Sequence, residues 1–500
     1  MLSTTFLGHQ GWLFQSKSSC FLVDPLLCEE FGQAHALEYR VYPPRVFSFE
    51  HFPRVDGVVL THEHDDHFDI PSLARLERTI PIFLSSRSST AAQQILREMG
   101  FTVHPLIPGK NVRFGDLEFT PFCGAHTSVN NNDEWDTLPF FVRDVGGSGN
   151  FFSMVDITLT DQHLKWARAR DSRPVVLSWT NNTLDWSHMS DFVGQRKAAT
   201  QECFMKMGVD RKIIIGAWGT PAATLMCAGG FTFYGERTWL NHRVFCVDNA
   251  SVCQMMSKLY PKEQFHATRP GQTFLMEGHR LKRIFDDTPF LTTAPPETWP
   301  ARGPRDASDA SGPSGPSGNA EPTDILDYAP ATGRTGMENA EYALLEQGLQ
   351  EFAGSLVGGT IFRGLHSLLD DQAKGRIPTF AVVLRDSRAG ERRVYEYVSS
   401  ACAFVPGHQG TANPEDTYLA GIECWATDLL AILKGELGPI ALSFGRARLW
   451  NALSEQFLFD IFGDLYRMSH PLRRPAEYLR TYQRLWTTSA NTAPAIFSPP

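Results

Sequence analysis

The N-terminal half of the chain is predicted to have an α/β fold, and two observations carry this prediction. Short apolar runs separated by turn residues recur from residue 4 onward, which is typical of buried strands. From residue 58 onward these runs alternate with helical patterns at residues 71–78, 91–99, 161–170 and 191–207. Because this alternation builds β-α-β units, it predicts sheet layers that are covered by helices.

Local signals place the individual elements of this half. Asp69 is expected to begin the first helix and Gly100 to end the second, because these residue types favour helix termini. Gly115-Asp116 is a hairpin-turn pair between two strand runs. The expected strands are residues 4–7, 11–14, 20–23, 58–60, 82–84, 112–114, 117–122, 140–145, 151–155, 175–178 and 212–216.

The length and composition predict more than one domain. At 500 residues the chain exceeds what one ordinary hydrophobic core holds. Residues 294–337 are rich in Pro, Gly, Ser, Ala and Asp, and this composition predicts a flexible linker. We therefore expect an N-terminal domain over residues 1–293 and a smaller C-terminal α+β domain over residues 338–500.

The C-terminal region has helix and strand patterns of its own. A helix is expected at residues 338–356, where Tyr342, Leu345, Leu349 and Phe352 follow helical spacing. Further expected elements are strands at 380–384, 394–398, 403–405 and 418–425, a helix at 426–434, and a last strand pair at 440–444 and 446–450. This region contains no recognisable catalytic set, and the sequence leaves its role open.

Charge and cysteine content exclude several classes of protein. A net charge of −9 argues against a nucleic-acid partner, which would require a basic face. The nine cysteines are scattered without a Cys-x-x-Cys pair, which predicts a reducing, cytoplasmic location with mostly buried thiols. We expect no transmembrane segment and no signal peptide, because the apolar stretches are too short and the N-terminus lacks the required pattern. The oligomeric state is not predicted.

A dense group of metal-binding residue types follows one of the buried strands. The apolar run at residues 58–60 leads directly into Thr61-His62-Glu63-His64-Asp65-Asp66-His67. His62 and His64 are two residues apart, so at a strand end their side chains can point the same way. Imidazole and carboxylate ligands together suit zinc, iron or manganese. The sequence therefore predicts a metal centre at the C-terminal end of this strand.

This segment resembles the His-x-His-x-Asp-His signature of the metallo-β-lactamase superfamily. Residues 6–12 and 21–25 are similar to the opening hairpins of its lactonase-like and phospholipase-D-like branch, in which a Gly-His pair ends the first strand. The resemblance implies the αββα sandwich, with Asp24 as a support residue of the metal loop. For His9 the sequence leaves two readings open, a turn residue without a role and a residue of the site.

The resemblance also implies the ligands of one or two divalent ions, with zinc expected and iron as the alternative. His62, His64 and His126 would form a three-nitrogen site with an open position, which is the pattern of catalytic zinc. A second site would consist of Asp66, His67 and Asp156, with Asp156 bridging the two ions. The catalytic roles would fall to Asp66, His126 and Asp156.

The chain departs from the family pattern at the last ligand. Relatives commonly show a His-Trp-Gly-Thr sequence after a late strand, and this chain has Ala217 where that histidine would stand. The second metal could therefore bind weakly or be absent. Another side chain could replace the nitrogen, with His188 and His242 as the candidates. The altered ligand set could also suit iron.

The expected function is a metal-dependent hydrolase that uses a metal-bound hydroxide on an ester, amide or phosphoester bond. An iron-dependent oxygenase or hydroxylase on the same fold is the alternative, supported by the missing histidine. A third hypothesis is a degenerate domain that binds without turnover. The substrate is expected to be a small or lipid-like molecule, because aromatic residues (Phe47, Phe49, Phe52, Trp135, Phe140) are expected at the site entrance.

Overall fold

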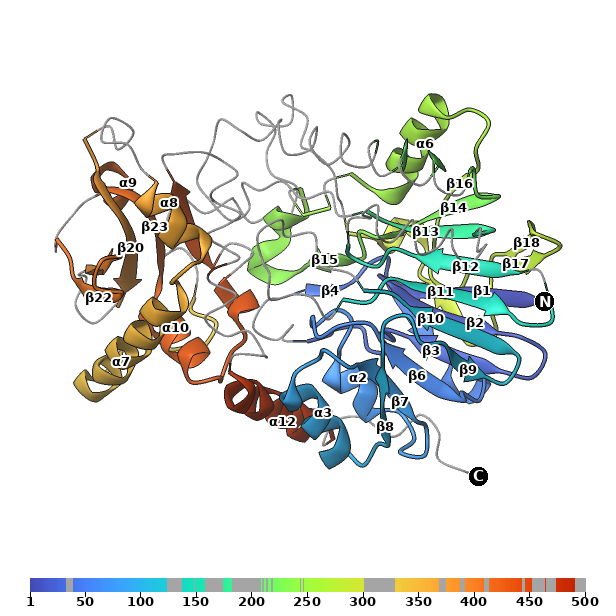
Figure 1. Cartoon of the computed structure of the whole chain (residues 1–500), viewed down its shortest axis with the longest axis horizontal. Coiled ribbons are helices and arrows are strands. Elements are labelled where there is room, and N and C mark those ends of the chain that lie inside the picture. Colours follow the sequence, from blue (N-terminus) through green and yellow to red (C-terminus); the bar gives the residue numbers. More distant parts are fainter. Residues whose placement is uncertain are drawn as a thin grey trace.

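The computed structural model places two mixed β-sheets face to face at one end of the molecule and a smaller sheet at the other (Figure 1). It describes residues 1–32, 39–123, 137–147, 149–157, 174–181, 208, 211–212, 215–216, 219–242, 244–245, 247–300, 329–367, 375–386, 392–408, 413–442, 446–451, 464 and 474–490. His126, Trp135, His188 and Ala217 lie outside the described residues, as do the helices expected at 161–170 and 191–207.

The first sheet of the sandwich has eight strands in the order β18-β17-β1-β2-β3-β6-β7-β8. The half formed by β3, β6, β7 and β8 is parallel, while the pairs from β18 through β17, β1 and β2 to β3 are antiparallel. The bounds are β1 (Leu2–Gly8), β2 (Gly11–Gln15), β3 (Cys20–Val23), β6 (Gly57–Leu60), β7 (Ile82–Ser85), β8 (Val103–Leu106), β17 (Thr273–Glu277) and β18 (Arg280–Phe285).

The second sheet has seven strands in the order β16-β14-β13-β12-β11-β10-β9. Strands β12, β13, β14 and β16 run parallel, so their C-terminal ends meet at one edge. The bounds are β9 (Val112–Phe114), β10 (Leu117–Pro121), β11 (Phe140–Asp144), β12 (Asn150–Ser153), β13 (Val176–Asn181), β14 (Ala223–Ala228) and β16 (Phe265–Ala267).

Aromatic side chains fill the space between the two sheets. Phe14, Phe21, Phe119, Phe140 and Phe151 are all buried in one cluster with apolar residues of both sheets. The Phe14 and Phe151 rings lie 5.0 Å apart and bring opposite sheets into contact. Each such side chain stabilises the fold by about 1.5–3 kcal/mol through burial. The expectation that Phe140 lines the site entrance is therefore wrong, since its ring belongs to this core.

Helices cover both outer faces, which confirms the αββα sandwich. On the first sheet, α2 (Ile70–Ala74) and α3 (Thr90–Glu98) pack with the apolar side chains of β6 and β7. The Asp69 carboxylate caps α2 by accepting a hydrogen bond from the Ser72 N–H, as expected. On the second sheet, α6 (Asn249–Leu259) packs against β13 and β14.

Short elements connect these layers. The pairs β4 (Tyr39–Val41) with β15 (Phe231–Phe233) and β5 (Arg45–Phe47) with β19 (Leu291–Thr293) form two small antiparallel ladders. Three 3-10 helices accompany them, η1 (Phe49–His51), η3 (Gly235–His242) and η4 (Pro296–Thr298).

The smaller sheet belongs to the C-terminal region and has the order β22-β21-β20-β23-β24. Helix α7 packs on it through Leu345, Leu349 and Phe352, which confirms the spacing seen in the sequence. The bounds are β20 (Ile377–Arg385), β21 (Arg392–Val398), β22 (Ala403–Pro406), β23 (Tyr418–Trp425), β24 (Ala447–Asn451), α7 (Asn339–Ser355), α8 (Thr360–His366), α9 (Pro414–Thr417), α10 (Ala426–Leu433) and η7 (Pro439–Leu442).

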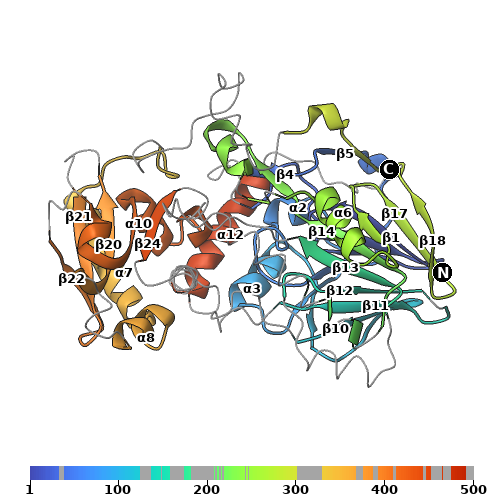
Figure 2. The same cartoon turned by 90° about the horizontal axis from the view of Figure 1, so that it is seen from above.

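The last helix, α12 (Pro475–Ala490), returns to the sandwich. It lies beside α2 and α3, and both views of the molecule show it next to α3 (Figures 1 and 2). Its residues Tyr478, Tyr482, Leu485 and Trp486 join the apolar cluster beneath α2 and α3. The final helix of the chain therefore forms part of the helix layer over the first sheet.

Two expected strands are absent from the described structure. Instead of the strand predicted at 212–216, the described positions Arg211, Lys212, Ile215 and Gly216 are helical, and the strand that pairs with β13 is β14. The described residues 440–442 of the run at 440–444 belong to the 3-10 helix η7. In both places a short apolar run was read as a strand, and periodicity alone does not separate a buried strand from a buried helical turn.

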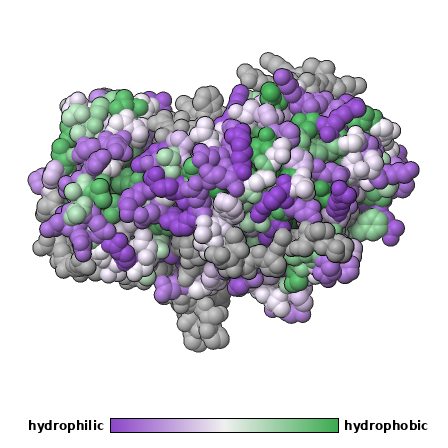
Figure 3. Space-filling view, turned by 90° about the horizontal axis from the view of Figure 1, so that it is seen from below, coloured by the Kyte–Doolittle hydropathy of each residue, from purple (hydrophilic) through white to green (hydrophobic). Residues whose placement is uncertain are grey.

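Hydrophobic and hydrophilic residues are interspersed over the face seen in Figure 3. The large apolar side chains that are exposed in the described part are distributed along both regions, from Met1 and Val46 to Val357 and Val405. Among the described helices, none combines the length and the apolar character needed to cross a bilayer.

Candidate metal centre

The metal loop begins where β6 ends. All four residues of β6 are buried between parallel neighbours, so the chain leaves the sheet at its C-terminal edge. The backbone then turns tightly, with the N–H groups of His67 and Phe68 both donating to the His64 carbonyl. This turn places His62 Nε2 3.1 Å from His64 Nδ1. The local sequence thus brings two imidazoles together before any distant residue contributes.

The first group of potential ligands consists of His62, His64 and Asp156. One ligand atom from each lies within 4.8 Å of the others. Asp156 follows β12 at the corresponding edge of the second sheet, and its Oδ2 lies 3.8 Å from His62 Nε2. Gln10 Nε2 donates to the other carboxylate oxygen at 2.6 Å, which fixes the orientation of Asp156. The two sheets therefore each contribute ligands to one buried site.

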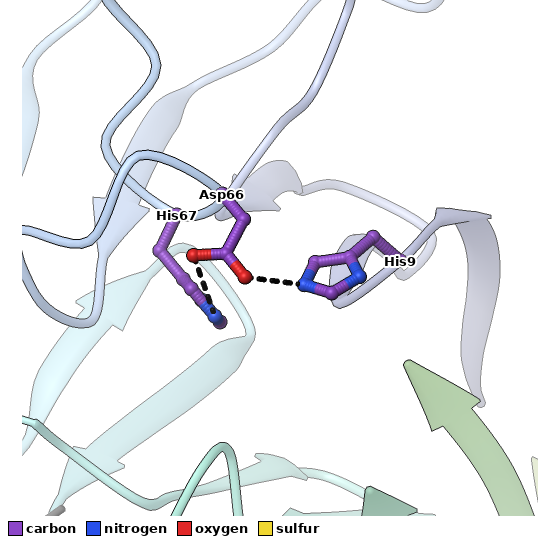
Figure 4. A group of neighbouring side chains, drawn as sticks. All are labelled: His9, Asp66 and His67. Atoms are coloured by element: carbon purple, nitrogen blue, oxygen red, sulfur yellow. Dashed lines mark hydrogen bonds and ion pairs between the residues drawn. The ribbon is translucent and has the colours of Figure 1, made fainter. Parts of the chain in front are cut away.

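The second group consists of His9, Asp66 and His67, which Figure 4 shows converging from two loops. His9 Nε2 lies 2.8 Å from Asp66 Oδ2, and His67 Nε2 lies 3.9 Å from Asp66 Oδ1. His67 Nε2 also lies 2.9 Å from Asp156 Oδ2. Asp156 thus lies between the two groups, at the position where a bridging carboxylate is expected.

Asp24 supports the metal loop from β3. Its carboxylate accepts hydrogen bonds from the Thr61 N–H at 2.8 Å and the Thr61 hydroxyl at 2.6 Å. It also accepts from His67 Nδ1 at 2.7 Å. With its proton on Nδ1, His67 presents the lone pair of Nε2 to the centre, which is how outer carboxylates orient metal-binding histidines. This arrangement matches the supporting role that the family resemblance implied for Asp24.

The charges of the cluster are those of a cation site. Burial acts to raise the pKa of Asp66, but the charge of His67 and the hydrogen bond from His9 outweigh it and hold this pKa well below its usual range. Burial acts to lower the pKa of His67, but Asp66, Asp24 and Asp156 together raise it well above its usual value. The carboxylates of Asp66, Asp24 and Asp156 thus draw positive charge to His67, and a divalent cation that displaced the proton would supply that charge.

The structure brings together five of the seven ligands proposed from the sequence: His62, His64, Asp66, His67 and Asp156. The other two, His126 and His188, lie outside the described residues. His9 is a member of the second group that the sequence left unassigned. The Gly-His pair at the end of the first strand was its sequence signal, but a single histidine in a turn does not reveal which loop it faces.

The strand expected directly before Ala217 is not found at the described positions. The helical positions around residue 215 mean that Ala217 does not follow the strand from which its role was inferred. The strand next to β13 is β14, and it runs into Ala228-Gly229-Gly230. This strand end carries no imidazole. Ala217 itself lies outside the described residues, so its assignment as the position of the lost histidine stays a prediction.

Comparison with known proteins identifies the N-terminal region. Residues 20–216 match the family described as the beta-lactamase superfamily domain. The chain is also similar to 4-amino-L-phenylalanyl-[CmlP-peptidyl-carrier-protein] 3-hydroxylase of Streptomyces venezuelae, with 30% identity over 131 residues. This match covers 24% of the chain and 23% of the hydroxylase, so the chain spans about a quarter of the length of that relative.

Solved structures give lower similarity. CmlA, a diiron beta-hydroxylase from Streptomyces venezuelae, is 14% identical, with a TM-score of 0.36 over 57% of this chain and 54% of that chain. A possible metal-dependent hydrolase from Veillonella parvula is 15% identical, with a TM-score of 0.38 over 55% of this chain and 100% of that chain. The family match and the sandwich described above lead to one conclusion: residues 20–216 match the beta-lactamase superfamily domain, and the N-terminal region that contains them has the metallo-β-lactamase fold.

Proposed function

We propose that the chain is a metal-dependent hydrolase whose reaction takes place where the two sheets of the sandwich meet. The observation that carries this proposal is the position of Asp156, whose Oδ2 lies 2.9 Å from His67 Nε2 and 3.8 Å from His62 Nε2. One carboxylate oxygen thus faces an imidazole of each ligand group. This arrangement supports a centre for two divalent ions that share Asp156.

The ligands are proposed as follows. His62 and His64 would hold the first ion together with His126, and His67 and Asp66 would hold the second. Asp156 would be shared by the two sites. A histidine-rich first site favours zinc, while the carboxylate-rich second site also accepts iron or manganese.

Ions bound at this centre would lower the pKa of a water molecule and polarise the oxygen of an ester, amide or phosphoester substrate. The chain's own residues prepare the site for that chemistry. Asp24 holds His67 in the tautomer that presents Nε2, and Gln10 holds Asp156 in its orientation. Asp66 is the partly exposed carboxylate of the centre, so we assign it the transfer of the proton.

Burial of the centre supports a small-molecule substrate. His62, His67 and Asp156 are all buried, and the floor of the site is formed by the two sheets. Among the described members of the two ligand groups, Asp66 and His64 are the partly exposed ones, so a substrate would approach the centre through them. A small substrate, or the end of a lipid-like one, meets this requirement.

A second candidate function is oxygenation, and a specific observation favours it. The curated relative with 30% identity over 131 residues is a 3-hydroxylase. Each described ligand group also has two imidazoles and one carboxylate, a composition that non-haem iron oxygenases use. Hydrolysis and oxygenation differ in metal and in co-substrate, so they are separable by experiment.

The deciding experiment measures metal content and oxygen uptake of the purified full chain alongside a panel of ester, lactone and phosphodiester substrates. Hydrolysis predicts turnover without oxygen uptake, lost in His64→Ala and retained in the control His104→Ala, whose side chain is exposed on β8. Oxygen uptake that requires bound iron, with no hydrolysis of any substrate, would establish the oxygenase instead. Full turnover by His64→Ala would refute both.

A further inference from the structure

The β1–β2 turn holds His9 in a conformation that is costly for a side-chain-bearing residue. His9 has a φ of 52° and follows Gly8, which has a φ of 113°. Residues other than glycine rarely adopt this left-handed region, and where they do the site is often functional. The carbonyl of His9 accepts a hydrogen bond of 2.7 Å from the Ala228 N–H at the end of β14. Two strand ends therefore fix the backbone from which the imidazole projects.

Packing then fixes the ring itself. His9 is 2% exposed and lies against Phe31 with a centroid distance of 6.4 Å and an interplanar angle of 20°. Phe231 lies 5.9 Å away on another side. With the ring held between these aromatic groups, Nε2 points to Asp66 Oδ2 at 2.8 Å. His9 thus presents one nitrogen to the second ligand group without freedom to turn away.

The close approach of residue 9 to the segment after β14 requires a residue without a side chain at position 230. A Cβ at Gly230 would lie 2.5 Å from His9 Cα and 2.8 Å from His9 Nδ1, closer than any real contact allows. Because the nearest atom belongs to the backbone, a side chain at position 230 would displace the β1–β2 turn that carries His9. The chain has glycine at position 230 and histidine at position 9.

We propose that His9 Nε2 is a nitrogen ligand of the second metal ion, in addition to His67. This inference rests on the two-ion centre of the proposed function and names the group that completes its second site. His9, Asp66 and His67 each place a ligand atom within 4.8 Å of the others, which one ion can bridge. The second site then has two nitrogens and the oxygens of Asp66 and Asp156.

The competing role for His9 is to orient Asp66 by a hydrogen bond, as outer residues of metal centres do. His9→Gln separates the two roles. The glutamine amide can still donate to a carboxylate, but its neutral groups are poor ligands beside imidazole. Orientation alone therefore predicts a functional second site in His9→Gln, whereas ligation predicts its loss.

The test is a titration of the metal-free full chain with Co²⁺, followed by visible absorption and by the bound metal per chain. Wild type is expected to bind two ions. His9→Gln is expected to bind the first normally and the second at least about 100-fold more weakly, since it loses a ligand rather than an outer partner. His104→Gln is the matched control and should behave as wild type.

Gly230→Ala is the second variant and changes no ligand. Its Cβ displaces His9, so the second ion should again weaken while the first stays bound. Wild-type binding of two ions by His9→Gln would overturn this inference and leave the proposed hydrolase intact. A wild type that binds a single ion would overturn the two-ion centre and this inference together. Loss of the second ion in His188→Ala, with His9→Gln unchanged, would identify His188 as the ligand instead.

Discussion

The hydroxyl of Tyr482 lies 3.4 Å from Glu63 Oε2 and joins the last helix of the chain to the metal loop. Glu63 stands between the first two histidines of the loop and is 9% exposed. Its carboxylate also accepts hydrogen bonds from the N–H and the hydroxyl of Ser89, the N-cap of α3. Glu63, which is adjacent to the candidate ligands His62 and His64, is thus hydrogen-bonded to both α3 and α12.

Tyr482→Phe should therefore weaken metal binding slightly. The 3.4 Å bond is long, so we expect a loss of a few-fold in affinity, below the 10–100-fold range for removal of closely bonded outer partners. The free energy of unfolding should fall by about 1 kcal/mol. Metal titration and thermal unfolding measure the two effects. The control is Gln483→Ala on the same helix as Tyr482, which removes an exposed contact with Glu98 of α3 and should leave metal binding unchanged. Equal losses of affinity in both variants would contradict the link through Glu63.

The five described ligand candidates proposed from the sequence all precede residue 157, so the metal should stay with the N-terminal region when the chain is cut. The cut would be made at a protease site inserted at residues 312–318. We expect the two pieces to remain associated after cleavage, because α12 packs on α2 and α3. After separation in denaturant and refolding, only the N-terminal piece should bind metal. Metal bound only by the C-terminal piece would contradict the domain assignment.

Metal affinity should depend on pH with a definite sign. The pKa of His67 is raised above its ordinary value in the metal-free protein, so His67 carries a proton that the metal must displace. Below the raised pKa, affinity should fall about tenfold for each unit of decreasing pH per proton released. Titrations between about pH 6 and pH 8 measure this slope. Affinity that stays constant over this range would show that His67 is not protonated in the metal-free site.

Asp24→Asn should weaken the second site through His67. The amide keeps the size of the side chain but no longer favours a proton on His67 Nδ1, so the ligand tautomer is less populated. We expect a loss of about 10–100-fold in affinity for the second ion, as for other outer-shell carboxylates. Asp287→Asn, at an exposed position after β18, provides the control. Unchanged affinity in Asp24→Asn would mean that packing alone orients His67.

The sequence predicted those parts of the centre whose signal is local. The buried strand β6 and the histidines after it lie within a few residues, and the turn of the loop alone brings His62 and His64 together. The placement of Asp156 required the order of strands, which the family resemblance supplied. The layers of the sandwich were also predicted, because most apolar runs were correctly assigned as strands and the family resemblance implied how they are arranged.

The missed features depend on contacts between distant residues. His9 and Asp66 are 57 positions apart, and Tyr482 and Glu63 are 419 positions apart, so no spacing rule relates them. The error at residues 212–216 has a local cause, because three consecutive isoleucines suit a buried strand and a buried helix equally. That error concerns the strand expected before Ala217, and the contact between positions 230 and 9 likewise could not be predicted from the sequence.

The most direct test of the central claim is the number of metal ions per chain in wild type and in Asp156→Asn. If Asp156 joins two ion sites, the purified wild type should carry two ions per chain by elemental analysis. Asp156→Asn should carry one or none, because both sites lose a charged ligand. Asp287→Asn should match wild type. An Asp156→Asn protein that keeps two ions per chain would contradict the shared two-ion centre.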